Sequence, residues 1–179
     1  MADFLNEKEN KILEIASRRK IYEIVKSSAG SHFREIGRKS NLGIGTVKYH
    51  LSYLVRHGLL KEQKDSNTTR YFPLAFDSKN MELLGLLRQK SIRDILLFIL
   101  TNENCNHEHI ASFTKLSPST VSWHVKKLEE HAIIQSKKTG RKTFYKLLTD
   151  KKEIMALLIT YQESFFDSLV DNVVEMWGM

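Results

Sequence analysis

The chain has 179 residues, of which 28 are basic and 21 acidic, for a formal net charge of +7. This length suits one large domain or two small ones. A single cysteine, Cys105, excludes an internal disulfide framework and fits a reducing compartment. The longest apolar run, Ile95 to Leu100, is far shorter than the ~20 residues of a membrane helix. We therefore expect a soluble cytoplasmic protein with no membrane partner.

The positive charge is unevenly distributed along the chain. Residues 19–76 contain 11 basic and 4 acidic side chains, residues 91–150 contain 9 and 6, and residues 151–179 contain 2 and 5. A basic body beside an acidic tail indicates a polyanionic partner for the body and a different role for the tail. The alternative interpretation is that the charge only keeps the protein in solution.

Two similar copies of one sequence pattern occur in the chain, at an offset of 74 residues. Two copies are too few for a solenoid, and each copy is long enough to bury its own core, so the repeat predicts two globular domains in tandem. The identical pairs include Arg19 and Arg93, Ile21 and Ile95, Ile36 and Ile110, Leu42 and Leu116, Thr46 and Thr120, Val47 and Val121, His50 and His124, Leu54 and Leu128, His57 and His131, Lys64 and Lys138, Thr69 and Thr143, and Tyr71 and Tyr145.

Helical periodicity dominates the first half of the repeated unit. Apolar residues at helical spacing predict a first helix from about Glu9 to Ser27. After a short extended segment at 31–33, residues 34–39 have room for two turns of helix. A longer amphipathic helix is predicted over 43–57, and again over its copy, 117–131.

The two long helices differ at their ends. In the second copy Ser117 can accept a backbone hydrogen bond and Pro118 sits where a missing N–H costs nothing, whereas Gly43 is a weaker cap in the first copy. At the other end, Gly58 suits a left-handed residue after the helix. Its counterpart Ala132 does not, so the second copy should end less favourably.

Each long helix is followed by two short apolar strands about a polar turn, which predicts a β-hairpin. Helix, short helix, turn, longer helix and hairpin is the element order of a winged helix-turn-helix. We therefore predict a mainly α fold with small hairpin wings, built as two tandem winged helix-turn-helix domains plus a long C-terminal helix. The expected boundaries are 1–76 for the first domain, 77–90 for a helical linker, 91–149 for the second domain and 150–179 for the C-terminal helix.

Two blocks, GTVKYHLSYLVRHGLL and STVSWHVKKLEEHAII, resemble the recognition helix and first wing strand of ArsR/MarR-type winged-helix transcriptional regulators. The tandem arrangement is similar to that of archaeal-type regulators with two such domains. The resemblance covers roughly residues 9–76 and 91–149. It implies DNA binding but names no regulated gene or ligand. The chain departs from the metal-sensing members, because its recognition helices carry no paired-cysteine motif.

A helix of ~10–12 Å diameter fits the major groove of DNA if its N-terminal half presents short polar side chains. Because Val47 and Val121 must face inward, the two residues that follow each of them should face DNA. Basic hairpin tips would reach phosphates or the minor groove. Packing of Tyr49 and Trp123 against the wing is the alternative interpretation. The expected DNA-binding residues are Thr46, Lys48, Tyr49, Ser52, Lys64, Asn67 and Arg70 in repeat one, and Ser119, Thr120, Ser122, Trp123, Lys126, Lys137, Lys138, Arg141 and Lys142 in repeat two.

Two groups of histidines raise the question of a chemical site. His50 and His124 recur in the repeat, and we interpret each as hydrogen-bonded to the wing backbone rather than as a ligand or base. Cys105, His107 and His109 would form a candidate metal or redox site if their segment were a strand. They lack an obvious fourth ligand and have no counterpart in repeat one, so we predict no metal and no other cofactor. No enzyme signature such as HExxH or GxSxG occurs.

The C-terminal segment carries an apolar stripe at steps of three and four residues, which predicts a long amphipathic helix. Such a stripe must be covered by its own repeat or by a partner chain. A helix of ~40 Å would overhang a small domain, so we expect a homodimer. The expected dimerisation residues are Ile154, Leu158, Tyr161, Phe165, Leu169, Val173 and Trp177.

These features together predict a sequence-specific transcriptional regulator that binds double-stranded DNA through two winged helices per chain and is not an enzyme. Two alternatives remain open. One is a protein-interaction module of the transcription machinery, in which one winged helix has lost DNA binding. The other is a regulator that senses a metal or ligand through the cysteine–histidine cluster or the tail. The net basic charge of both repeats favours DNA.

Overall fold

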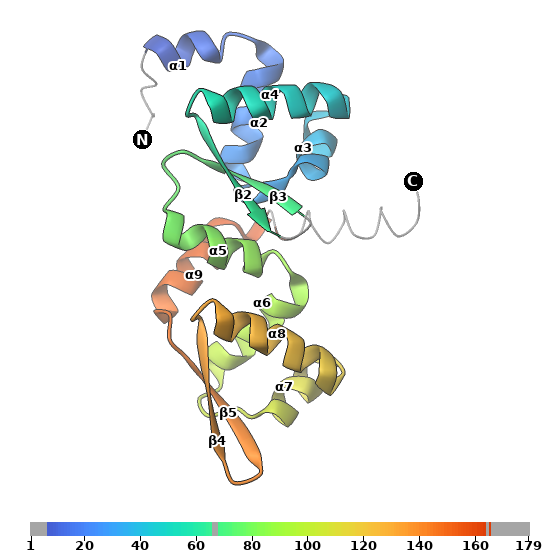
Figure 1. The fold of residues 1–179 in the computed structure, drawn as a ribbon, viewed down its shortest axis with the longest axis vertical. Helices are drawn as coiled ribbons and strands as arrows, with labels where there is room; N and C mark the ends of the chain where they lie inside the picture. The colour runs from blue at the N-terminus through green and yellow to red at the C-terminus, as the bar shows by residue number, and fades with distance from the viewer. Residues whose placement is uncertain (1–6, 66–67, 164, 166–179) are drawn as a thin grey trace. The chain divides into compact units, whose positions relative to one another are not determined.

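The computed structural model describes residues 7–65, 68–163 and 165. Its elements are mostly helices with small antiparallel sheets, in the order predicted for two winged helix-turn-helix domains (Figure 1). Among the described residues, no helix is both long enough and apolar enough to span a bilayer.

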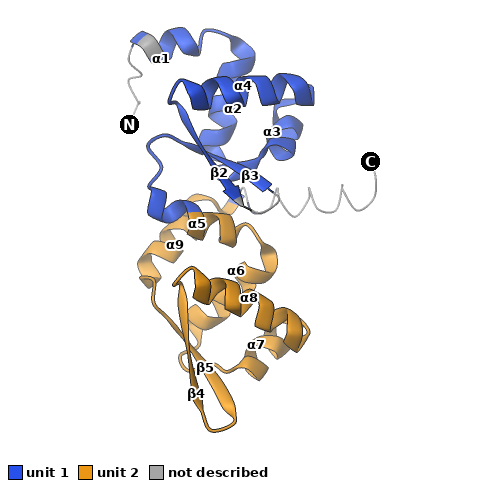
Figure 2. Ribbon diagram, in the orientation of Figure 1, with its two compact units in different colours: residues 1–81, 163–179 blue, residues 82–162 orange. Residues whose placement is uncertain are grey.

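The chain divides into two compact units (Figure 2). Unit 1 comprises residues 1–81 and 163–179, and unit 2 comprises residues 82–162. Each unit contains one copy of the helix-turn-helix and one β-hairpin.

Unit 1 contains a three-stranded antiparallel sheet in the order β1-β3-β2. The hairpin register pairs Lys64 with Thr69, and β1 adds to the far side of β3 by pairing Ser31 with Tyr71. In the described part of unit 1, four helices lie before the hairpin of this sheet. The elements are α1 (Glu7–Ile12), α2 (Ala16–Ser27), β1 (Ser31–His32), α3 (Phe33–Ser40), α4 (Ile44–Arg56), β2 (Leu60–Asp65) and β3 (Thr68–Pro73).

Unit 2 repeats this plan with a two-stranded sheet, in which Lys138 pairs with Thr143. Residue Asn106 makes an isolated bridge to Phe144, where unit 1 has the short strand β1. The elements are α5 (Ser78–Leu87), which begins in unit 1, then α6 (Lys90–Thr101), α7 (His107–Thr114), α8 (Pro118–Glu130), β4 (Ile134–Thr139), β5 (Lys142–Leu147) and α9 (Lys151–Thr160).

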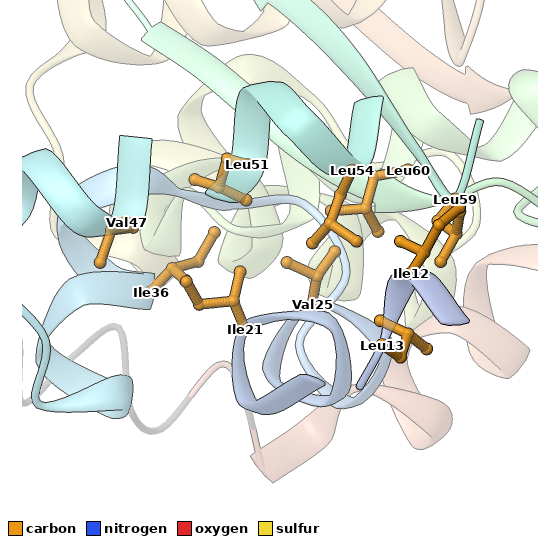
Figure 3. Packing of buried hydrophobic residues seen from close by; sticks show 10 residues of the cluster. All are labelled: Ile12, Leu13, Ile21, Val25, Ile36, Val47, Leu51, Leu54, Leu59 and Leu60. Carbon is orange, nitrogen blue, oxygen red and sulfur yellow. The ribbon is translucent and has the colours of Figure 1, made fainter. Parts of the chain in front are cut away.

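The core of unit 1 is an apolar cluster beneath α4 (Figure 3). Val47, Leu51 and Leu54 project from one side of α4 toward Ile21 and Ile36, and all five are fully buried. Because each such side chain contributes about 1.5–3 kcal/mol when removed from water, this burial determines which side of α4 faces outward. The same pattern buries Val121, Val125 and Leu128 in α8 of unit 2.

The prediction of one helix from Glu9 to Ser27 is wrong, because the chain breaks between α1 and α2. In a straight helix that turns ~100° per residue, Ile12 and Ile21 would point to opposite sides, yet both lie in the core. With the break, Ile12 and Leu13 are buried and Ile15 is 47% exposed. The carbonyls of Ile12 and Leu13 accept hydrogen bonds from the guanidinium groups of Arg18 and Arg19, at 2.8 and 2.9 Å.

The predicted cap at Ser117, the position of Pro118 and the left-handed Gly58 are confirmed. The Ser117 hydroxyl accepts a hydrogen bond from the Thr120 amide at 3.2 Å, and Pro118 is the first residue of α8. Gly43 makes no side-chain cap on α4. After the helices, Gly58 and Ala132 both adopt left-handed conformations, with φ of +72° and +52°.

The left-handed pair at the helix ends gives a prediction about stability. Ala132→Gly should raise the free energy of unfolding by about 1 kcal/mol, because an L-residue with a Cβ is strained at positive φ and Ala132 is exposed. Gly58→Ala should lower it by a similar amount, since a Cβ at Gly58 would meet no atom within 4 Å and only the backbone strain would count. Urea unfolding of both variants measures this; equal stabilities for variants and parent would contradict it.

Candidate nucleic-acid interface

The outward side of α4 presents the residues predicted for the major groove. Val47 is fully buried, so the helical turn leaves Thr46, Lys48, Tyr49 and Ser52 exposed. Tyr49 is 61% exposed although it lies in the middle of the helix. Its ring makes an edge contact with His50, with the centroids 5.2 Å apart, and most of the ring remains uncovered rather than packed on the wing.

On the matching side of α8, two of the predicted hydroxyl groups are already engaged within the helix and its cap. Trp123 is 59% exposed, and Lys126 and Ser119 are also exposed. The Ser122 hydroxyl donates to the Pro118 carbonyl at 2.9 Å, so this donor is already used within the helix. Thr120 is half-buried, and its hydroxyl lies 2.8 Å from that of Ser117. Trp123 is therefore the aromatic side chain that α8 presents outward.

The two hairpin tips differ in charge. Lys137, Lys138, Arg141 and Lys142 surround the turn between β4 and β5, and all four are exposed. A tip with four cations and no acidic side chain produces a strongly positive local potential, suited to phosphate contacts.

The tip of repeat one holds less free charge. Lys64 forms an ion pair with Glu62 at 3.5 Å, and the Arg70 guanidinium donates to the Gly30 carbonyl at 2.9 Å. Asn67, which we also predicted as a DNA contact, lies outside the described residues. Arg70 thus connects β3 to the loop before β1.

Sequence reasoning missed a cavity in unit 1, between the start of α3, the outer side of α4 and strand β3. Its volume is about 570 Å³. A difference between the repeats could have pointed to it, because Arg34 on its rim corresponds to Glu108 in repeat two. The lining residues are His32, Phe33, Arg34, Lys48, Ser52, Thr68, Thr69 and Tyr71. We call this cavity the notch.

The repeated histidines lie on the buried sides of the recognition helices. His50 is 6% exposed, and its Nε2 lies 2.9 Å from the Ser17 hydroxyl on α2. The predicted bond to the wing backbone is therefore wrong for His50, because the ring points toward α2. His124 is 8% exposed, and the Nδ1 atoms of both histidines have no hydrogen-bond partner.

The side chains of Cys105, His107 and His109 do not point to a common site. Their segment caps and begins α7 rather than forming a strand, so His107 and His109 lie on different sides of the helix. The ring nitrogens of His107 lie 3.0 Å from the Tyr145 hydroxyl and 3.0 Å from the Pro118 carbonyl. Cys105 is buried, and burial raises the pKa of its thiol. Within the described part of the chain, no three His, Cys, Asp or Glu side chains are placed to hold a metal ion.

The predicted dimerisation stripe begins with covered residues. Ile154 is fully buried and Phe165 is 5% exposed, so the chain itself covers both. Leu158 and Tyr161 are half-buried. The remaining predicted residues, Leu169, Val173 and Trp177, lie outside the described residues.

Known families match both repeats. Residues 16–84 match a family described as an N-terminal HTH domain, and residues 88–135 match one described as winged helix-turn-helix DNA-binding. Each unit is therefore a winged helix-turn-helix domain, and the chain contains two of them in tandem.

A curated relative shares part of its length with this chain. Over 139 residues the chain is 33% identical to the uncharacterized HTH-type transcriptional regulator MJ1398 of Methanocaldococcus jannaschii. The alignment covers 76% of this chain and 34% of that protein, so the chain spans about a third of its relative.

Two solved structures resemble about half of the chain. Reduced HlyU from Vibrio cholerae is 26% identical, with a TM-score of 0.43, over 47% of this chain and 90% of that one. MarR is 21% identical, with a TM-score of 0.42, over 54% and 72%.

The two buried histidines predict a dependence of stability on pH. Burial first, and then the positive charge of Arg18 or Lys127, lowers the pKa of His50 and His124 below the ordinary value of 6.5. At these two histidines the unfolded chain therefore binds protons more readily than the folded chain. The free energy of unfolding should be highest above about pH 6.5 and should fall as the pH decreases below that value.

Urea unfolding between about pH 5 and pH 7.5 measures this effect. In the double variant His50→Gln and His124→Gln, the loss between these limits should become smaller. An equally steep loss in the variant would show that other groups are responsible.

Proposed function

We propose that the chain is a sequence-specific transcriptional regulator of ArsR/MarR type that binds double-stranded DNA through both winged helices. The observation that carries this proposal is the exposure of a large aromatic ring at the same position of each recognition helix, Tyr49 and Trp123. A single exposed aromatic ring is ordinary on a protein surface, but an exposed ring at the same outward position of both helices favours a contact made with a partner.

The chemistry of the two faces fits the major groove. Thr46 and Tyr49 on α4, and Ser119 and Trp123 on α8, offer hydroxyl groups and apolar surface to base edges and thymine methyl groups. Lys48 on α4 adds a cation suited to guanine or phosphate. A helix of ~10–12 Å diameter fits a groove ~12 Å wide.

The basic tip of repeat two supplies attraction that does not depend on sequence. Its four cations would release counterions from the DNA backbone, and binding would weaken as salt increases. A regulator built this way reads sequence with its helices and gains affinity from its wings.

This division of roles predicts two distinguishable variants. Tyr49→Ala with Trp123→Ala should reduce the ratio of operator to random-DNA affinity by about tenfold or more, since base contacts are each worth ~1–3 kcal/mol. Arg141→Ala with Lys142→Ala should weaken operator and random DNA alike and make the salt slope less negative by about 0.9 per lost phosphate contact.

The operator can be obtained by selecting bound duplexes from a random pool, and fluorescence anisotropy at several salt concentrations then gives both quantities. If the aromatic variants lowered both affinities equally while the tip variants reduced only specificity, the assignment of the groove-facing elements would be reversed. A parent chain without affinity for duplex DNA would refute the function itself.

We further propose that the protein is a homodimer through its C-terminal segment. The support is the apolar stripe that continues from Leu158 and Tyr161 toward Trp177 in the sequence. Because Ile154 and Phe165 are already covered within the chain, the proposed interface is made of the other predicted residues: Leu158, Tyr161, Leu169, Val173 and Trp177. A symmetric dimer would present four recognition helices and favour an operator with two-fold symmetry.

Sedimentation velocity at micromolar concentration tests the dimer. The full chain should sediment as a dimer, and a chain ending at Gln162 should be a monomer with weaker operator binding. This end point keeps α9 and its buried Ile154 but removes the buried Phe165, so a cooperative unfolding transition of the shortened chain is the control for folding. A monomeric full chain would require the dimer to be abandoned.

A further inference from the structure

The notch in unit 1 is a polar, basic cavity beside the recognition helix. Arg34 and Lys48 contribute positive charge, and Ser52, Thr68 and Thr69 contribute hydroxyl groups. Of the described residues that line it, none is acidic. A cavity of about 570 Å³ with this lining is suited to an anion that accepts several hydrogen bonds.

A single aromatic ring positions both cations of the notch. The Lys48 ammonium lies 4.8 Å from the centroid of the Phe33 ring, and the Arg34 guanidinium carbon lies 5.9 Å from it. The ring face attracts each cation and holds it at the cavity. A carboxylate would neutralise the positive charge, but the uncharged ring does not. The positive potential in the notch is therefore retained.

Repeat two lacks the two cations of the notch. At the 74-residue offset, Arg34 corresponds to Glu108 and Lys48 to Ser122, so the positive charge is lost and an acidic residue is added. Phe33 corresponds to His107, whose ring nitrogens are taken up by the Tyr145 hydroxyl and the Pro118 carbonyl, each at 3.0 Å. These bonds join the start of α7 to β5 and α8 where repeat one has the notch.

The hairpin tips show the opposite difference. The basic tip residues Lys137, Arg141 and Lys142 correspond at the same offset to Gln63, Asn67 and Thr68. The fourth, Lys138, corresponds to a lysine that is paired with Glu62. Apart from the paired Lys64, the cations at these compared positions lie in the notch in repeat one and at the hairpin tip in repeat two.

We propose that the notch binds a backbone phosphate of duplex DNA, so that repeat one contacts the DNA backbone between α3, α4 and β3, whereas repeat two contacts it through its hairpin tip. This inference rests on the proposed function, since the same DNA must occupy the face formed by α4. The notch opens beside Lys48 and Ser52 on that face, and a phosphodiester there accepts hydrogen bonds from Arg34, Lys48 and the β3 hydroxyls.

The test removes one notch cation from the full chain and compares it with a matched cation elsewhere in the same unit. Arg34→Ala should weaken operator and random duplex alike, by roughly three- to tenfold, and make the salt slope less negative by about 0.9. Lys20→Ala, on the exposed side of α2, removes the same charge outside the notch and should leave the slope unchanged. Arg34→Glu, which installs the repeat-two residue, should weaken binding further.

Both positions are exposed, so equal melting temperatures for the variants and the parent check that folding is intact. If the parent chain binds DNA but Arg34→Ala behaves like Lys20→Ala, the notch inference is overturned and the proposed function stands. Failure of the parent chain to bind duplex DNA would refute both the notch inference and the proposed function.

Inorganic phosphate, titrated by NMR into the parent and into Arg34→Ala, provides a second measurement. Saturable shifts at Arg34, Lys48 and Thr69 that disappear in the variant, together with the weakened DNA binding, support a phosphodiester site. The same shifts with DNA binding unaffected would make the notch a site for a small free anion and would overturn the proposal.

Discussion

Burial along one side of each recognition helix is the constraint on which the rest of the structure depends. Val47, Leu51 and Leu54 are removed from water together, and because a helix turns ~100° per residue, their burial determines the direction of every other side chain on α4. Tyr49 is exposed for this reason. The same geometry in α8 exposes Trp123 above the buried Val121. The candidate DNA-binding surface is thus a consequence of the core.

The repeat preserves the interactions that form the scaffold. Arg19 donates to the carbonyl of Leu13 at 2.9 Å, and its counterpart Arg93 donates to the carbonyl of Leu87 at 2.8 Å. Each bond joins the second helix of a repeat to the end of the helix before it. The segment expected as a linker, α5, therefore holds the position in repeat two that α1 holds in repeat one.

The chemistry outside this scaffold has diverged between the repeats. His107 forms a hydrogen-bonded connection between helix and wing, whereas Phe33 at the same position supports two cations. Because such differences lie outside the buried core, they change the stability of the fold little. They do change where charge lies on the surface. Two domains of one fold can in this way contact a single nucleic acid differently.

The sequence by itself determined the tandem fold, the inner and outer sides of α4 and α8, and the left-handed end at Gly58, because these depend on local periodicity and backbone sterics. Only the tertiary structure decided that Arg70 is used to bind Gly30, and that His50 faces Ser17. These contacts join residues 40 and 33 positions apart, and no local pattern specifies them. The notch has the same origin, since its lining comes from the start of α3, from α4 and from β3, which become neighbours only when the core packs.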